Sequence, residues 1–394
     1  MGLPLKYNFR NVLVRWRATL STILGIALVV AVFVLLRALA QGIEASSANT
    51  GDPRNVLVVR KGSQAESGSL VTLEQFRTVR YFDEIATNAN GQPLVSAELV
   101  MLVSVPRLNG SGEANTLVRG VTPRGMELRP QVTLTEGRWF DPGHREITVA
   151  RKLSNRFAGL QIGGTIKAGR DRLTVVGLFD GLGSAFDSET WMDADESRAI
   201  FDRGEMYSSI LLRPRDAAAL VALTNRVALD KRLSLRADSE VGYYQKQTLS
   251  AMPFKILAAL LGVAMSIGAV FAAMNTMYAS VASRTREIGT LRVLGFSRTS
   301  VVVCFLIEGA FLAALGGITG CVVAVALQTY VIARGITFGT LDFQSFSETV
   351  YQFRITPNLV GMGIFFAVLI GLAGSLLPAV RAARLPVISA LKSL

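Results

Sequence analysis

Few side chains in this sequence could carry out nucleophilic, acid–base or metal chemistry. The 394 residues include one histidine, His144, and two cysteines, Cys304 and Cys321. A single histidine argues against a metal site with several His ligands and against a Ser-His-Asp triad within one chain. Both cysteines fall inside an apolar run, and His144 follows an Asp-Pro-Gly turn. We therefore expect no catalytic residue, metal site or cofactor site in this chain.

Carboxylates and glycines are the remaining sources of chemistry. A run of acidic residues could serve a membrane enzyme, but we interpret it as a solvated loop and the start of a helix. The glycine-rich stretch 316–320 lacks the lysine of a phosphate-binding loop and lies in an apolar segment, which favours close helix packing. The sequence has no Walker A pattern, so we expect no ATP site. The acidic run comprises Asp187, Glu189, Asp193, Asp195 and Glu196.

The basic segment 283–300 has a helical pattern that a simple loop would not need. Ile288, Leu291 and Leu294 recur every three residues and share one face of a helix. Such a helix can lie on a membrane surface or contact a soluble partner. Charged residues surround the apolar face: Arg284, Arg286, Glu287, Arg292 and Arg298.

The elements on either side of this segment are apolar enough to cross a membrane. Half of the chain is apolar and its mean hydropathy is +0.40. Each of four runs reaches the roughly 20 residues that a membrane-spanning helix needs. These runs are 19–39, 254–281, 301–332 and 357–377. The first also resembles a secretory signal ending in Ala-Leu-Ala, but its length favours a retained anchor.

The positive charge lies in short segments at the ends of these runs. Segments 1–18, 282–300 and 380–394 carry +4, +3 and +3 of the formal net charge of +12. This distribution follows the positive-inside rule and places both termini and segment 282–300 in the cytoplasm. The basic character therefore indicates topology, and we expect no nucleic-acid partner.

The long segment between the first two runs predicts an external α+β domain. We expect strands at 55–60, 94–105, 146–150, 165–167, 173–178 and 208–212, helices at 72–82, 152–158 and 216–229, and an inner lobe at 131–213. The fold class is therefore four transmembrane helices, one N-terminal and three C-terminal, with this domain between the first and second. The expected order is a cytoplasmic segment (1–18), a first transmembrane and stalk helix (19–50), the external domain (51–240), a stalk and second transmembrane helix (241–282), a cytoplasmic helix (283–300), a third transmembrane helix (301–333), an external loop (334–356), a fourth transmembrane helix (357–379) and a cytoplasmic tail (380–394).

Small residues and one acid stand out within the spans. Small side chains every four residues let helices approach closely, either within the chain or between two copies. Because four spans enclose no pathway, we expect a dimer. Glu308 is costly in a membrane, so it serves proton coupling or pairs with a basic residue such as Arg292 or Arg381, and we favour the pair. The expected packing residues are Gly309, Ala313, Gly316, Gly317 and Gly320.

Three motifs together resemble the MacB, LolC and FtsX class of ABC-transporter permeases. The first comprises Arg284, Arg286-Glu287-Ile288-Gly289, Leu291-Arg292 and Leu294-Gly295; the second comprises 305–310 and 316–320; the third is the tail 378–386 with 390–391. The resemblance, to a MacB-like periplasmic core domain and an FtsX-like permease domain, covers essentially the whole chain. It implies that segment 283–300 is a coupling helix that docks on a separate ATP-binding subunit. The implied coupling residues are Arg284, Arg286, Glu287, Ile288, Gly289, Leu291, Arg292, Leu294 and Gly295.

The same resemblance implies the partners and the mechanism. ATP and Mg would bind to a dimeric partner ATPase, whose closure would move the external domain. Further expected partners are a second permease copy or paralogue, a periplasmic adaptor and membrane lipids. The implied role, in the bacterial inner membrane, is export or extraction of a hydrophobic or lipid-like substrate. An FtsX-like regulator of a cell-envelope enzyme or signalling partner is the alternative. We expect that this chain, unlike MacB, has no fused ATPase domain, and it is longer than a typical FtsX.

Overall fold

The computed structural model describes residues 16–110, 112–247, 252–334, 338–341, 347–351 and 355–385. The chain forms two compact units, one helical and one of mixed strands and helices. Residues 1–15 of the expected cytoplasmic segment 1–18, residues 386–394 of the expected cytoplasmic tail 380–394, and parts of the expected loop 334–356 lie outside the described residues.

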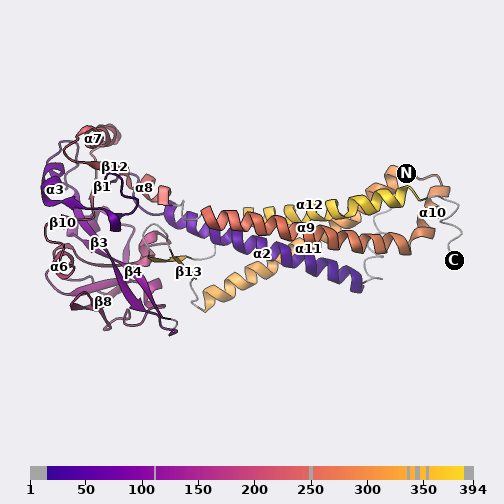
Figure 1. Ribbon diagram of the computed structural model, residues 1–394, viewed down its shortest axis with the longest axis horizontal. Helices are drawn as coiled ribbons and strands as arrows, with labels where there is room; N and C mark the ends of the chain where they lie inside the picture. The colour runs from indigo at the N-terminus through magenta and orange to yellow at the C-terminus, as the bar shows by residue number, and fades with distance from the viewer. Residues whose placement is uncertain are drawn as a thin grey trace. The chain divides into compact units, whose positions relative to one another are not determined.

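Long apolar helices build the first unit. Each of four is long and apolar enough to span a membrane, as the sequence predicts. They run side by side, and the short helix α10 lies at one end of the bundle (Figure 1). The helices are α2 (Trp16–Ala48), α9 (Met252–Ser283), α10 (Thr285–Val293), α11 (Arg298–Ala333) and α12 (Pro357–Ala383).

Local capping fixes where two of these helices begin. Ser297 precedes α11, and its hydroxyl accepts a hydrogen bond from the Ser300 amide at 3.1 Å. Thr356 precedes α12, which starts with Pro357, a residue whose missing amide hydrogen costs nothing at that position. These two caps begin the helices at the polar ends of the apolar segments, so the local sequence sets where each of these spans starts.

The second unit is built on one ten-stranded mixed sheet. Its strand order is β12-β1-β11-β3-β4-β9-β6-β8-β5, with β7 paired to β8. Most neighbours are antiparallel, but β4 pairs with β9 and β6 with β8 in parallel. The strands are β1 (Val56–Arg60), β3 (Val95–Pro106), β4 (Glu113–Val121), β5 (Thr133–Gly137), β6 (Glu146–Ala150), β7 (Thr165–Ala168), β8 (Asp171–Asp180), β9 (Glu189–Asp193), β11 (Ser209–Leu212) and β12 (Leu235–Ser239).

Short helices and two small ribbons complete this unit. The ribbons pair β2 (Val71–Thr72) with β10 (Met206–Tyr207) and β13 (Phe338–Leu341) with β14 (Glu348–Tyr351). The helical elements are η1 (Glu66–Gly68), α3 (Leu73–Arg80), α4 (Pro123–Leu128), α5 (Arg151–Ser154), η2 (Ala185–Ser188), α6 (Ala194–Ile200), α7 (Ala217–Leu229) and α8 (Glu240–Gln247).

The predicted strands are all present in the sheet. Buried apolar residues form two clusters, one dominated by β3 to β9 and one by β1, β11 and β12. Strand β11 pairs with β1 and β3. The expected inner lobe at 131–213 stays a prediction.

Candidate functional site

The predicted helix in the basic segment is present as α10. It begins directly after Arg284, and Leu294 ends it. Gly295 then adopts φ +91°, a left-handed conformation that favours glycine. The resulting turn connects α10 to α11. Arg292 stabilises this turn, because its Nη1 donates to the carbonyl oxygen of Phe296 at 2.9 Å.

A buried ion pair fixes the start of α10 to α11. Arg284 Nη1 lies 3.0 Å from Glu308 Oε2, and both side chains are nearly inaccessible, at 8% and 7%. The Nε of Arg284 also lies 3.3 Å from Glu287, and its guanidinium lies over the Phe305 ring. Glu308 therefore pairs as expected, but with Arg284. Of the two arginines named as examples of a partner, Arg292 contacts the turn and Arg381 lies over the Tyr278 ring.

The expected apolar face of α10, formed by Ile288, Leu291 and Leu294, is partly buried and partly exposed in the structure. Ile288 is 3% exposed and packs against Val281, Val301 and Phe305, and Gly289 is also buried. Leu291 is half-buried, whereas Leu294 is 70% exposed. Ile288, Gly289 and Arg284 therefore anchor α10 within this chain and cannot form its outer surface. The outward side chains are Arg286, Glu287, Val293 and Leu294.

The predicted small residues of α11 pack helices within the chain. A Cβ on Gly309 would lie 2.6 Å from Ser375, and one on Gly317 would lie 2.7 Å from the Cβ of Ala367, so this row meets α12. Ala313 on the same row is fully buried. The neighbouring row meets α2, since a Cβ on Gly316 or Gly320 would lie 2.9 Å from Ile26 or 2.5 Å from the Ala27 carbonyl oxygen.

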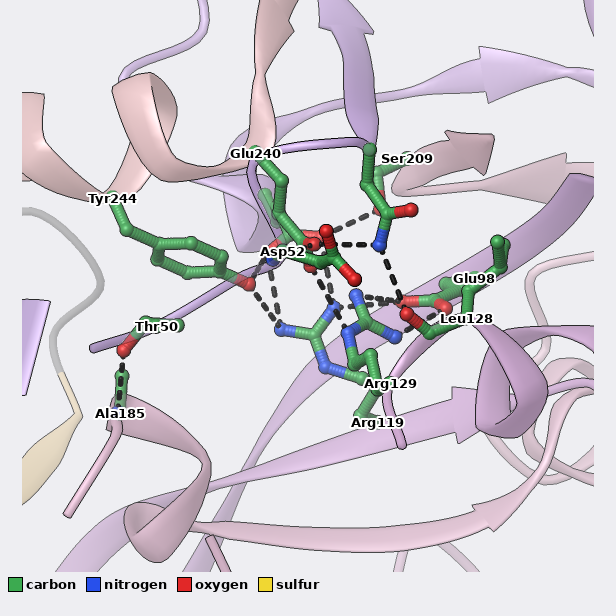
Figure 2. Close-up of polar contacts among 12 residues, drawn as sticks. Thr50, Asp52, Glu98, Arg119, Leu128, Arg129, Ala185, Ser209, Glu240 and Tyr244 are labelled. Atoms are coloured by element: carbon green, nitrogen blue, oxygen red, sulfur yellow. Dashed lines mark hydrogen bonds and ion pairs between the residues drawn. The ribbon is translucent and has the colours of Figure 1, made fainter. Parts of the chain in front are cut away.

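A second polar centre lies buried in the external unit (Figure 2). Arg119 on β4 contacts Glu66 at 2.9 Å, Glu98 at 2.9 Å and Glu189 at 2.7 Å. Arg129, after α4, contacts Glu98 at 2.6 Å and Glu240 at 3.1 Å. These side chains are between 0% and 5% exposed. We call these six residues the charge cluster: Glu66, Glu98, Arg119, Arg129, Glu189 and Glu240.

Burial and pairing act in opposite directions on the acids of the charge cluster. Burial would raise the pKa of Glu66, but the Arg119 guanidinium outweighs it and lowers that pKa to about 2. Burial raises the pKa of Glu240 despite its contact with Arg129. Burial also raises the pKa of the Tyr244 phenol, which donates to Glu66 at 3.2 Å. The cluster thus brings four carboxylates together with two guanidinium groups.

Glu240 joins the segment that follows α2 to the start of α8. The Asp52 amide and the Asn55 side chain both donate to Glu240 Oε2 at 2.9 Å. Gly51 has φ +90°, and a Cβ there would lie 2.7 Å from Glu240. Both ends of the external unit's main segment therefore meet at the charge cluster.

Sequence reasoning missed this cluster, and it predicted only part of the acidic run correctly. The expected helix start is present as α6, and Asp195 in its first turn is 79% exposed. Asp187 and Glu189, however, are each 2% exposed and Asp193 is 7% exposed, so this part of the run is not solvated. Asp187 accepts from the amides of Gly181 and Gly183 and pairs with Lys152, and Asp193 caps α6. The available signal was a single charge inside an apolar strand, such as Glu98 or Arg119.

Two family models match successive parts of this chain. Residues 18–228 match the MacB-like periplasmic core domain, and residues 259–387 match the FtsX-like permease C-terminal domain. An uncharacterized ABC transporter permease of Methanocaldococcus jannaschii is 26% identical over 66% of this chain and 65% of its own length. A macrolide export ATP-binding/permease protein MacB of Bdellovibrio bacteriovorus is 25% identical over 95% of this chain and 58% of its own length. The chain thus spans less than two thirds of either relative.

The fold can also be compared with the solved structure of a periplasmic domain. The periplasmic region of MacB from Actinobacillus actinomycetemcomitans is 12% identical, with a TM-score of 0.36, over 49% of this chain and 91% of its own length. The two family matches together take in all four candidate spans and most of the external unit, so this is a membrane protein with an extracytoplasmic domain. The chain therefore belongs to the MacB- and FtsX-like class of ABC transporter permeases.

Proposed function

We propose that this chain is a permease subunit whose helix α10 docks on a separate ATP-binding subunit. The observation that carries the proposal is the division of α10 into two sides. Arg284 and Ile288 hold one side firmly against α11, while Arg286, Val293 and Leu294 remain outside. A force applied to the outer side would therefore move α11 with it. The positive charge of segments 1–18, 282–300 and 380–394 supports a cytoplasmic position for α10 and both termini, where ATP is available.

The charge cluster supports transmission of movement through the external domain. Its buried ion pairs connect β3, β4, β9 and α8, and hydrogen bonds extend it to Asp52 and Asn55. Because breaking such contacts is costly, these elements move together. Displacement of the segment after α2 would thus shift the sheet as a body, as mechanotransmission requires. Substrate need not pass between the spans.

A second permease copy and a lipid-like substrate fit the exposed surfaces of the helical unit. The apolar segment of α9 is 22% buried, against 39% to 44% for the other three spans. A groove of about 290 Å³ between α2 and α9 has apolar walls that include Ile26, Val29 and Met265. Such a groove suits an acyl chain or another hydrophobic molecule. Passage across the envelope would then involve a periplasmic adaptor at the external domain.

Leu294→Asp tests the docking proposal directly. Placing a charge on this exposed side chain should leave the protein folded and abolish its contact with the ATP-binding subunit that we expect to co-purify with the native chain. We expect at least about tenfold weaker binding, equivalent to about 1.4 kcal/mol, and loss of stimulated ATP hydrolysis. Leu229→Asp is the matched control, because Leu229 is 79% exposed on α7 of the external unit. Normal binding and hydrolysis in the Leu294 variant would refute the proposal.

A further inference from the structure

A groove with two arginines lies where α11 begins and α12 ends. Its volume is about 360 Å³, and its apolar walls come from Val302, Val303 and Val380. Arg298, the first residue of α11, and Arg384, which directly follows α12, form its charged edge. The helix ends meet here because Val301 and Phe305 pack against Ala379, Ala382 and Ala383. The groove therefore passes from charged to apolar at one end of two membrane spans.

Neither arginine pairs with an acid among the residues that the structure describes. Both side chains are exposed, and within the part of the chain that the structure describes neither guanidinium forms an ion pair. Arg298 also adds positive charge to the N-terminal end of α11, where the helix dipole is already positive. An anion in the groove would be stabilised by both guanidinium groups and by this end of the helix. The nearby Thr299 hydroxyl offers a further polar contact.

We propose that this groove binds an anionic phospholipid, with the phosphate between Arg298 and Arg384 and the start of an acyl chain along Val302 and Val303. The charge excludes a neutral hydrocarbon as the best ligand, and the apolar walls distinguish a lipid from free phosphate. Basic pockets between helices at a membrane surface bind anionic headgroups in this way. The site would couple lipid charge to the position of α10, which shares the Val301 and Phe305 contacts.

Native mass spectrometry of the full chain in detergent tests this site. The probes are dioleoyl phosphatidylglycerol, dioleoyl phosphatidylcholine and inorganic phosphate. We expect phosphatidylglycerol to bind more tightly than phosphatidylcholine. The double variant Arg298→Gln/Arg384→Gln should bind phosphatidylglycerol about 30-fold more weakly, equivalent to about 2 kcal/mol for two basic groups. Each single variant should bind phosphatidylglycerol about fivefold more weakly. If the double variant does not elute as the wild type does, and is therefore misfolded, the single variants provide the test.

Arg334→Gln is the matched control, since Arg334 follows α11 at its other end. It should leave phosphatidylglycerol binding unchanged. Equal binding of the two lipids, or equal loss in the control, would overturn the proposal. Competition by inorganic phosphate at the lipid's own concentration would identify an ion site instead. Unchanged lipid binding with loss of the ATP-binding subunit would assign the groove to a protein interface and also overturn it.

Discussion

Replacing Arg119 with methionine should destabilise the external domain by about 3–5 kcal/mol, the usual cost of leaving buried charges without their partner. Methionine removes the charge and keeps most of the side-chain length. The guanidinium now donates to Glu66, Glu98 and Glu189 at 2.7 to 3.0 Å. Other donors remain, since Ser209 donates to Glu66 and Arg129 to Glu98. These contacts limit the loss to that of one buried pair.

The loss should depend on pH in a defined direction. Arg119 helps to hold the pKa of Glu66 at about 2, below its ordinary value of 4.5. A carboxyl with a lowered folded-state pKa stabilises the fold above its unfolded pKa, here by about 3 kcal/mol, and this contribution is lost as pH falls through the folded pKa. In the variant, burial without Arg119 lets the carboxyl hold a proton in the folded state. The difference between wild type and variant should therefore shrink as pH falls from 7 towards 4.

Tryptophan fluorescence during thermal unfolding measures this effect in the full chain. Two of the three tryptophans, Trp139 and Trp191, stack with ring centroids 6.1 Å apart in the external unit, and Trp191 donates to Glu189. The expected loss lowers the midpoint by roughly 6 to 20 °C for a domain of this size. Arg124→Met is the control, because its exposed pair with Glu127 contributes only about 0.5 kcal/mol. Equal shifts in both variants, or a difference that does not change with pH, would refute the reasoning.

Two more predictions concern the helical unit, with stability followed by helical circular dichroism during heating in detergent. Arg284→Met should cost about 3–5 kcal/mol by removing the buried guanidinium that pairs with Glu308, and adding Glu308→Leu should restore part of that loss; strictly additive losses would contradict the pairing. Gly317→Leu should cost about 1–3 kcal/mol through overlap with Ala367, whereas Gly361→Leu, where no atom lies within 4 Å, should cost little; similar losses at both glycines would contradict close packing at Gly317.

The spans and much of the sheet could be predicted because their signals are local. Twenty apolar residues suffice to indicate a membrane helix, and alternating apolar residues indicate a strand such as Glu146–Ala150. Strands β4 and β9 were missed because each carries charged residues that ordinarily mark a surface, Arg119 and Glu189 among them. The Arg119 and Glu189 side chains are buried together because β4 and β9 lie side by side in the sheet, paired in parallel with Leu117 opposite Glu189. That pairing is non-local, so no window of sequence reveals it.

The basic segment 283–300 also shows that local sequence does not reveal non-local contacts. Three-residue spacing correctly predicted a helix, but it could not say which apolar side chain turns inward. Ile288 is buried and Leu294 exposed because Arg284 pairs with Glu308, 24 residues away, and sets the rotation of α10. The sequence indicated a pairing for Glu308 without identifying the right arginine.

Photo-crosslinking in intact cells from a probe at position 294 tests the central claim most directly. Leu294 lies on the outer side of α10, and Tyr330, 54% exposed near the other end of α11, is the matched control position. We predict a crosslink from position 294 to an ATP-binding subunit and none from position 330. A protein that folds and inserts normally but gives no such crosslink from position 294, or gives it equally from both positions, would contradict the account.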